Sequence, residues 1–312
     1  MTYRLVTRSD FDGLVCAVLL RQLDLIDEII FVHPKDVQDG TELITERDIL
    51  TNLPYAPAAH LVFDHHHSEM LRVGSGPANY VIDPAAPSAA RVVYDHFGGA
   101  ARFPGISDEL MDAVARADSA AYQIEEVLRP DGWTLLNFIM DSRTGLGRFR
   151  DFTISNYELM MQLIAACGRH EAVAEILALP DVVERTELYR AQAELFVEQL
   201  RRVSRQYRDV VVVDLRAEEI IHAGNRFMVY ALFPEARVSI HVIWGRGKVN
   251  TVLAVGKSIV DRSSPADIGS VMLLYGGGGH VAAGTCQVAH EESERVLAEV
   301  LDAVGAPVVS PR

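Results

Sequence analysis

The segment HLVFDHHHSE, residues 60–69, places a cluster of titratable side chains directly after a short apolar run. The run at 60–63 predicts a buried strand, because it is short, apolar and bounded by polar residues. Asp64 and the histidines after it are costly to place at such a strand end unless they bind something. Successive residues there point in different directions, so one histidine can bind a metal while its neighbour faces a substrate. The alternative interpretation is a surface run of histidines.

The rest of the first half of the chain alternates apolar runs of strand length with helical patterns. Such βα alternation predicts a mostly parallel sheet with helices on its faces. The predicted strands are residues 3–7, 28–32, 60–63 and 80–82, and the predicted helices are residues 14–23, 88–96 and 108–119. Ligands bind sheets of this kind beyond the carboxyl ends of the strands, which is where the acidic and histidine clusters fall.

The hydrophobic pattern of the second half of the chain changes twice, first to a helical pattern and then to strands followed by helices. From residue 155 to about 209 the pattern is almost wholly helical and amphipathic, which indicates a connector. Strands are then predicted at 210–213, 227–232, 238–244 and 251–255, followed by helices at 267–274 and 291–304. We therefore predict an α/β protein with a parallel-sheet domain at 1–180, a helical connector at 181–206, a smaller α/β domain at 207–312 and a cleft between the domains.

The composition limits the classes of function. The 312 residues have a formal net charge of -14, which opposes binding to long duplex nucleic acid because that binding depends on neutralising many phosphates. The chain shows no stretch typical of a membrane span and no secretory pattern in its first residues, so we expect a cytoplasmic protein. The widely spaced Cys16, Cys167 and Cys286 are expected to be small buried residues rather than disulfide partners or zinc ligands.

Acidic residues form two further candidate positions. Asp10 and Asp12 lie between the first predicted strand and its helix, where both carboxylates can face a common cation, and such hard oxygen donors suit Mn²⁺ or Mg²⁺. The alternative is that Ser9 or Asp10 only caps the helix. Asp118, at a predicted helix end, could by itself simply pair with Arg116. Only the other clusters make Asp118 a candidate ligand.

A glycine-rich segment, YGGGGHVAAG at residues 275–284, joins a run of glycines to His280 and small residues. Backbone amides without neighbouring side chains can approach anionic oxygens closely. A flexible linker fits this segment badly, because it lies within a pattern of strands and helices. A dinucleotide-binding fingerprint also fits badly, since that motif opens the first βα unit.

In their order along the chain, these motifs resemble those of the DHH superfamily of phosphoesterases. Its N-terminal domain carries Asp-x-Asp and Asp-His-His, and its C-terminal associated domain carries Gly-Gly-Gly-His-x-x-Ala-Ala-Gly. The matching segments here are Asp10-Phe11-Asp12, Asp64-His65-His66 and residues 277–284. The resemblance covers most of the chain and is strongest to exopolyphosphatase-like and oligoribonuclease-like members.

The resemblance implies divalent cations, usually a pair of Mn²⁺ ions with Mg²⁺ as the alternative, that activate a water for attack on phosphorus. Asp64 would support the metal cluster, and His66 would contact the scissile phosphate. The implied metal ligands are Asp10, Asp12, His65 and Asp118. The residues implied to hold the rest of the substrate are Gly277, Gly278, Gly279 and His280, aided by Lys257 or Arg262.

Two positions depart from the family pattern. Many members have a histidine shortly before the first aspartate, whereas this chain has Arg8 there, a catalytic-site cation that cannot bind a metal. Members also have an aspartate at the end of a strand before the triplet, where the best-matching position is Asn52. The site could therefore hold one metal, or Asn52, His33 or Asp36 could complete it. Alternatively, His33 only starts a loop and Asp36 is a solvated acid.

The leading functional prediction is metal-dependent hydrolysis of phosphodiester or phosphomonoester bonds in short nucleotides. The substrates considered are short oligoribonucleotides, linear dinucleotides and 3′,5′-bisphosphates. An exopolyphosphatase or pyrophosphatase is the second prediction, which the associated domain disfavours by family analogy. A catalytically weakened nucleotide-binding protein is the third, motivated by Arg8 and Asn52. A homodimer is left open.

Overall fold

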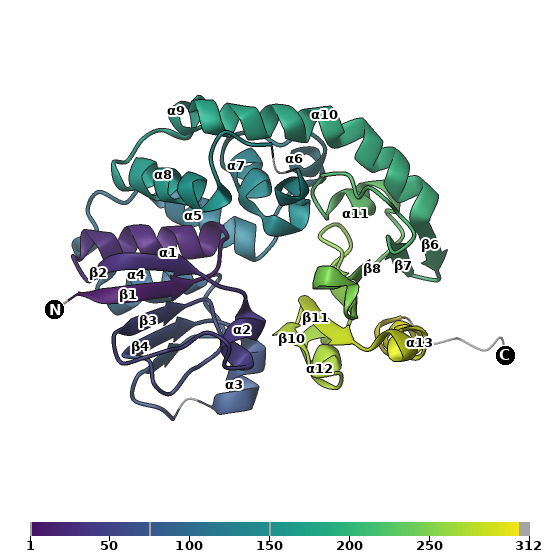
Figure 1. The fold of residues 1–312 in the computed structure, drawn as a ribbon, viewed down its shortest axis with the longest axis horizontal. Coiled ribbons are helices and arrows are strands. Elements are labelled where there is room, and N and C mark those ends of the chain that lie inside the picture. Colours follow the sequence, from purple (N-terminus) through teal and green to yellow (C-terminus); the bar gives the residue numbers. More distant parts are fainter. Residues whose placement is uncertain (1, 75, 150, 306–312) are drawn as a thin grey trace. The chain divides into compact units, whose positions relative to one another are not determined.

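The computed structural model describes residues 2–74, 76–149 and 151–305, which divide into two compact units. Unit 1 comprises Met1–Tyr122 and Arg129–Ala191, and unit 2 comprises Gln123–Leu128 and Gln192–Arg312. The division falls within helix α10, Pro180–Val203. Each unit has its own β-sheet (Figure 1), which confirms the predicted α/β class. The predicted domain limits at residues 180 and 206 stay a prediction.

The sheet of unit 1 is parallel, with the strand order β2-β1-β3-β4-β5. The sequence patterns predict four of these strands, whereas β3 is implied only by the family pattern around Asn52. The strands are β1 Tyr3–Thr7, β2 Ile26–Phe31, β3 Asp48–Thr51, β4 Leu61–Asp64 and β5 Tyr80–Ile82. Since β1, β3 and β4 are neighbours, the residues that follow them lie at one edge of the sheet.

Helix α1, Phe11–Gln22, follows β1 directly and anchors unit 1. It begins where the Asp10 side chain accepts a hydrogen bond from the Gly13 amide, and its first ten residues are buried. It packs against α4, α5 and α8. The other helices of this unit are α2 Pro34–Gln38, α3 His67–Val73, α4 Ala89–His96, α5 Asp108–Asp118, α7 Gly132–Met140, α8 Asn156–Gly168 and α9 Val173–Leu177, with short 3-10 turns η1 Gly99–Ala101, η2 Ser142–Thr144 and η3 Leu146–Arg148.

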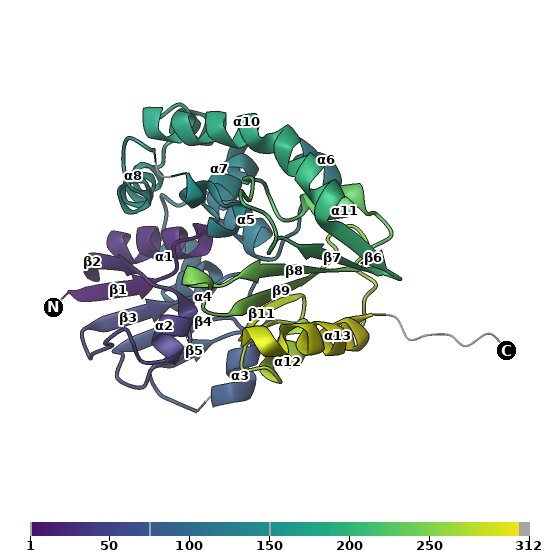
Figure 2. The same ribbon diagram turned by 45° about the vertical axis from the view of Figure 1, so that its right-hand side comes forward.

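The sheet of unit 2 has the strand order β10-β11-β9-β8-β7-β6, in which β7 and β8 are parallel and the other neighbours antiparallel. Helices α12 and α13 lie on one side of it (Figure 2) and bury an apolar core with its strands. The elements are α6 Ile124–Leu128, β6 Ser204–Tyr207, β7 Val210–Asp214, α11 Met228–Leu232, β8 Val238–Trp244, η4 Arg246–Lys248, β9 Thr251–Lys257, α12 Ile268–Leu273, β10 Gly278–His280, β11 Ala283–Val288, η5 His290–Glu292 and α13 Ser293–Val304.

Two element predictions in unit 2 are wrong. The segment 227–232, predicted as a strand, forms α11, because a short apolar run has no periodicity that separates a buried helix from a buried strand. The end of the predicted helical stretch forms β6, which pairs antiparallel with β7. Its polar sequence gives no strand pattern, so the partner strand decides its conformation.

Two further expectations concern the membrane and the cysteines. In the part of the chain that the structure describes, no helix has both the length and the apolar character needed to cross a bilayer. Cys16, Cys167 and Cys286 are buried and carry free thiols, as predicted.

A buried ion pair ties β1 to β3. The Asp48 side chain is fully buried, accepts from Arg4 Nε at 2.7 Å and Arg4 Nη2 at 3.0 Å, and accepts from the Thr45 amide at 2.6 Å. Burial alone would raise the pKa of Asp48, but the hydrogen bonds from Arg4 and Thr45 lower it below its ordinary value. A lowered pKa stabilises the fold above the unfolded pKa of about 3.9, and this contribution is lost as pH falls through the folded pKa.

We expect Asp48→Asn to lower the free energy of unfolding by about 1–3 kcal/mol at pH 7, because the Arg4 guanidinium loses its buried charged partner. Urea denaturation at pH 7 and below pH 4 measures the effect, and the difference from wild type should shrink at the lower pH. Glu42→Gln is the matched control, since Glu42 contacts the same arginine at 3.5 Å but is more exposed. Equal losses in the two variants would contradict the prediction.

Candidate metal centre

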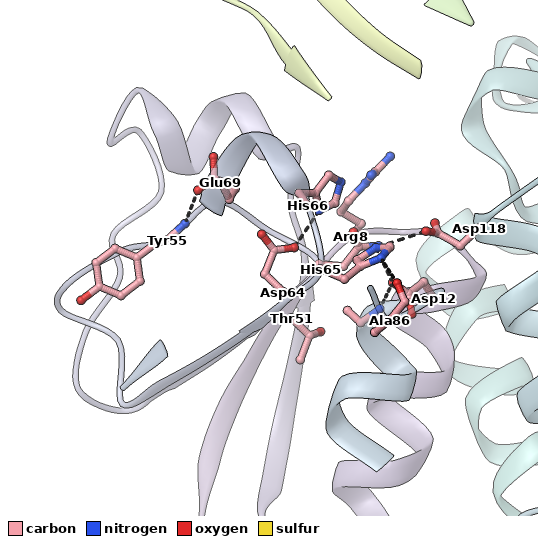
Figure 3. A network of polar contacts seen from close by, with 12 residues as sticks. Arg8, Asp12, Thr51, Tyr55, Asp64, His65, His66, Glu69, Ala86 and Asp118 are labelled. Atoms are coloured by element: carbon pink, nitrogen blue, oxygen red, sulfur yellow. Dashed lines mark hydrogen bonds and ion pairs between the residues drawn. The ribbon is translucent and has the colours of Figure 1, made fainter. Parts of the chain in front are cut away.

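The polar side chains of the site follow three neighbouring parallel strands, β1, β3 and β4. Figure 3 shows several of them gathered beside the strand ends. In chain order, the residues after β1, after β3 and at the end of β4 are Arg8, Asp10 and Asp12, then Asn52, then Asp64, His65 and His66. The structure thus places these predicted residues of unit 1 at one edge of the sheet.

Asp12, His65 and Asp118 form a compact cluster there. His65 Nε2 lies 3.1 Å from Asp118 Oδ2 and 3.8 Å from Asp12 Oδ2. One ligand atom from each residue lies within 4.8 Å of the others. Asp12 and His65 are buried, and Asp118, the last residue of α5, is partly exposed. Two carboxylate oxygens and an imidazole nitrogen around one point are donors that suit a divalent cation.

Backbone groups fix the orientation of the buried members of this cluster (Figure 3). Asp12 accepts hydrogen bonds from the amides of Ala89 at 2.9 Å and Ala90 at 2.7 Å, at the start of α4. His65 Nδ1 lies 3.3 Å from the carbonyl oxygen of Ala86, to which it can donate only when it carries the proton. The neutral ring then presents Nε2 as an acceptor toward the two carboxylates. This is the tautomer that binds a metal through Nε2.

The charges of the cluster also fit a cation. Burial, followed by the negative charge of Asp118, raises the pKa of Asp12 to about 7. Burial disfavours a charged His65, but Asp118 and Asp12 outweigh it and raise the pKa of the imidazole to about 10. The two carboxylates therefore need a nearby positive charge. A divalent ion meets that need and uses the neutral imidazole as a ligand, so the donor set fits a metal.

Asp64 and His66 form a second pair beside the cluster (Figure 3). Asp64 is fully buried, and its Oδ1 lies 2.7 Å from His66 Nδ1. Its Oδ2 accepts a hydrogen bond from the Tyr80 hydroxyl at 3.3 Å. Burial would raise the pKa of Asp64, but His66 outweighs it and the net shift is downward. An ionised Asp64 thus holds the His66 ring through Nδ1 and leaves Nε2 as the nitrogen for other contacts.

Asp10 has a different environment from Asp12. Its Oδ1 accepts from the Gly13 amide at 3.0 Å and from Asn52 Nδ2 at 3.3 Å. Its Oδ2 accepts from Asn52 Nδ2 at 3.4 Å and lies 3.2 Å from Arg8 Nε. Asp10 therefore both caps α1 and pairs with the two residues that depart from the family pattern. In the described part of the chain, it is outside the ligand group of Asp12.

The alternative ligands His33 and Asp36 lie at the start of α2. His33 is the N-cap of α2, and its Nδ1 accepts from the Lys35 amide at 3.2 Å. Asp36 lies in the first turn of that helix. Among the described residues, neither belongs to a group that could hold a metal. Their contacts agree with the alternative given above, in which His33 only begins a local element and Asp36 is a surface acid.

The glycine-rich segment of unit 2 is a β-hairpin rather than a loop. Strand β10 pairs with β11, and Gly278 to His280 lie opposite Thr285 to Ala283. The Lys257 amide donates to the Ala282 carbonyl at 2.8 Å, so Lys257 lies beside this hairpin. Arg262 lies in the turn after β9, where its Nε donates to the Ile259 carbonyl at 3.4 Å. Roles of these residues in substrate binding stay predictions.

The glycines of this hairpin have a packing requirement of their own. A Cβ atom at Gly277 would lie 2.1 Å from the Thr285 carbonyl oxygen. Gly279 has φ +153°, and a Cβ there would lie 2.2 Å from the Ala283 carbonyl oxygen. Side chains at these positions would separate β10 from β11, so the motif is needed for the close pairing of the strands.

We expect Gly277→Ala to lower the free energy of unfolding by about 1–3 kcal/mol, because its methyl group would collide with the backbone of β11. Gly276→Ala is the control, since its Cβ would meet nothing within 4 Å although φ is +72°. Strain alone should cost the control about 1 kcal/mol. Thermal unfolding of both variants measures the difference, and a control as unstable as Gly277→Ala would contradict the packing explanation.

Arg143 is a residue near the site that the sequence patterns miss. It lies on η2, where Asp141 Oδ1 accepts from Arg143 Nε at 2.7 Å. Burial opposes its charge, but Asp141 first, and then Asp10 and Asp118, raise the pKa of Arg143 above its ordinary value. The guanidinium is therefore close enough to feel two carboxylates of the site. The local signal, an Asp-x-Arg turn after an apolar helix, is too common to single it out.

Comparison with known proteins places this geometry in a family. No family model and no curated protein matches the chain significantly. Among solved structures, a pGpG-specific phosphodiesterase, PggH, from Vibrio cholerae is 57% identical with a TM-score of 0.76, covering 97% of this chain and 99% of that chain. The chain belongs to the DHH family of phosphoesterases.

A second solved structure is more distant. RecJ in complex with Mn²⁺ from Thermus thermophilus is 18% identical with a TM-score of 0.43, covering 95% of this chain and 51% of that chain. The predicted family and the predicted hydrolase class are confirmed by the 57% identical relative. The protein is a metal-dependent phosphodiesterase, in agreement with the Asp12, His65 and Asp118 cluster.

Proposed function

We propose that this protein hydrolyses the phosphodiester bond of a short linear dinucleotide, with pGpG as the first candidate. The observation that carries the proposal is the cluster of Asp12, His65 and Asp118 beside the Asp64–His66 pair, in a chain 57% identical over nearly its whole length to a pGpG-specific phosphodiesterase. The reaction adds one water to the central phosphodiester. The bond from phosphorus to the 3′ oxygen breaks, and two nucleoside 5′-monophosphates result.

The residues of the cluster would hold the cation and exclude bulk water from its buried side. A bound divalent ion supplies Lewis-acid activation of the phosphate and of the attacking water. Asp12 and His65 are held rigidly by the start of α4 and by the Ala86 carbonyl, so two of the three ligands are preorganised. Asp118, partly exposed, is the ligand on the solvent side.

His66 is the proposed contact to the scissile phosphate. Asp64 fixes its ring by accepting a hydrogen bond from Nδ1, and Nε2 donates a proton or a hydrogen bond to a phosphate oxygen when the ring carries protons on both nitrogens. The ionised Asp64 also stabilises the positive charge that develops on the ring. In unit 2, the predicted holders of the rest of the substrate remain those implied by the family, Gly277, Gly278, Gly279, His280, Lys257 and Arg262.

The acidic composition favours a short substrate. A net charge of -14 supports few contacts to a long phosphate backbone, whereas a dinucleotide needs only local positive charge at the site. A homodimer and a cytoplasmic location stay predictions.

We expect wild-type protein with Mn²⁺ to hydrolyse pGpG, and His66→Ala to lower kcat by about 10²–10³-fold because it removes a donor to the developing charge. Asp64→Asn should lower kcat by about 10–100-fold by releasing the His66 ring. His67→Ala is the matched control: the neighbouring histidine, at the first position of α3, should keep wild-type turnover. Product formation from pGpG is measured by chromatography.

The same assay separates the alternative functions. Turnover of pyrophosphate or polyphosphate in preference to every nucleotide would support the second prediction and contradict ours. Nucleotide binding without turnover would support the weakened, binding-only protein. Equal activity of His66→Ala and His67→Ala would contradict the site.

Mn²⁺ is the proposed metal, because an imidazole among the ligands disfavours Mg²⁺, which prefers oxygen ligands. We expect chelation to abolish turnover and Mn²⁺ to restore it more fully than Mg²⁺ at equal concentration. Restoration by Mg²⁺ alone would contradict the choice of metal. Activity that survives chelation, with metal content below one ion per ten chains by mass spectrometry, would contradict the metal dependence of the site.

A further inference from the structure

Three residues beside the metal cluster, Arg8, Asp10 and Asn52, form a contact set of their own. Asp10 is one of the carboxylates that the family pattern assigns to a metal, and the other two residues occupy positions where family members carry a histidine and an aspartate. In the structure both departures meet on Asp10: Arg8 Nε lies 3.2 Å from Oδ2, and Asn52 Nδ2 lies 3.3 and 3.4 Å from the two oxygens. The two substitutions are therefore parts of one arrangement.

This arrangement does not fit a second metal ion. Every oxygen of Asp10 already faces a donor, because the Gly13 amide also donates to Oδ1 at 3.0 Å. Asn52 turns its amide nitrogen, the positive end of its side chain, toward the carboxylate. A cation at Asp10 would have to displace the Arg8 guanidinium or lie against it, and like charges at such distances repel strongly.

The balance of charge leads to the same conclusion. One divalent ion neutralises the carboxylates of Asp12 and Asp118 when His65 is neutral. Arg8 neutralises Asp10. Asp64, the carboxylate at the end of β4, is already paired with His66. A second divalent ion would therefore lack the balancing carboxylate that family members carry after β3, where this chain has the neutral Asn52.

We propose that this site binds a single divalent ion, at Asp12, His65 and Asp118, and that the Arg8 guanidinium replaces the second ion as the positive charge that binds the substrate phosphate. The phosphate part of this inference rests on the proposed function. The metal count does not.

The position of Arg8 suits this task. Its side chain is 27% exposed, and within the described residues its one charged contact is with Asp10. The terminal nitrogens, which lie beyond Nε, make no hydrogen bond to the described part of the protein. In Figure 3 the side chain extends away from the strands on the same side as the His66 ring. A guanidinium held at one end presents a planar pair of donors that matches phosphate oxygens.

Metal content tests the first half of the proposal without any activity assay. Metal-free protein is saturated with Mn²⁺, excess ion is removed, and the bound ion per chain is measured by mass spectrometry. Asp118→Asn supplies the baseline for ions that bind the acidic surface. We expect one ion above that baseline in wild type and two in the double variant Arg8→Met/Asn52→Asp, which frees Asp10 and restores an acid beside it.

Two ions in wild type would overturn the proposal. It would equally be overturned if the double variant, shown to be folded by an unchanged circular dichroism spectrum and a cooperative melt, still bound one ion. Asn52→Asp alone, which keeps Arg8, should stay at one ion.

Binding of GMP to the Mn²⁺-loaded protein tests the second half. By calorimetry, Arg8→Met should weaken GMP binding about 10- to 100-fold while the metal content stays at one ion, and Arg8→Lys should recover part of the loss. Unchanged affinity in Arg8→Met would show that Arg8 only supports Asp10, and would overturn the phosphate role. If wild type hydrolyses no nucleotide, the proposed function fails, whereas the metal count still decides the number of ions.

Discussion

The contact between the Asp12 carboxylate and the first amides of α4 is the constraint on which the site depends. It joins residues 77 and 78 positions apart in the sequence, and it fixes the carboxylate that faces His65. A buried carboxylate is costly unless hydrogen bonds and a cation compensate it. The amides at the start of α4 donate the hydrogen bonds that Asp12 needs. The nearby carboxylate of Asp118 adds negative charge, so the cluster also needs a cation. The metal site and the packing of α1 against α4 therefore form together.

The second carboxylate of the same turn, Asp10, is compensated in a different way. Its oxygens accept hydrogen bonds from the Gly13 amide and from the Asn52 side chain, and the Arg8 guanidinium provides a positive charge beside them. The two acids, separated by one residue, thus differ in their positive partners. Arg8 beside Asp10 is always charged, whereas His65 beside Asp12 is charged only when it is protonated. This contrast is the reason to treat the family's Asp-x-Asp motif here as one metal ligand and one support for a fixed cation.

In unit 2, the glycine-rich motif shows that a binding signature can also be a packing requirement. The Cβ positions of Gly277 and Gly279 are filled by the carbonyl groups of the paired strand. The Gly277 amide donates to the Met272 carbonyl at 3.0 Å, so it too takes part in the packing of this segment. A role of these glycines in substrate binding stays a prediction. Variants in this hairpin will change stability as well as any affinity, and each effect needs its own measurement.

The sequence by itself determined the α/β class, four strands of the first sheet, and the identity of most residues at its carboxyl edge. It could do so because strand patterns are local and the ends of neighbouring parallel strands meet. It failed at 227–232 and at β6, where short or poorly patterned segments follow their tertiary partners.

Only the tertiary structure decided which of the acidic residues meet. Asp118 reaches His65 from the end of α5, Arg8 and Asn52 meet on Asp10 across two strands, and Arg143 comes within range from η2. These contacts join residues far apart in sequence, and the packing of helices on the sheet sets their distances. The sequence identified the candidates for a metal site, whereas the fold decided which carboxylate lies beside His65 and which one lies beside Arg8.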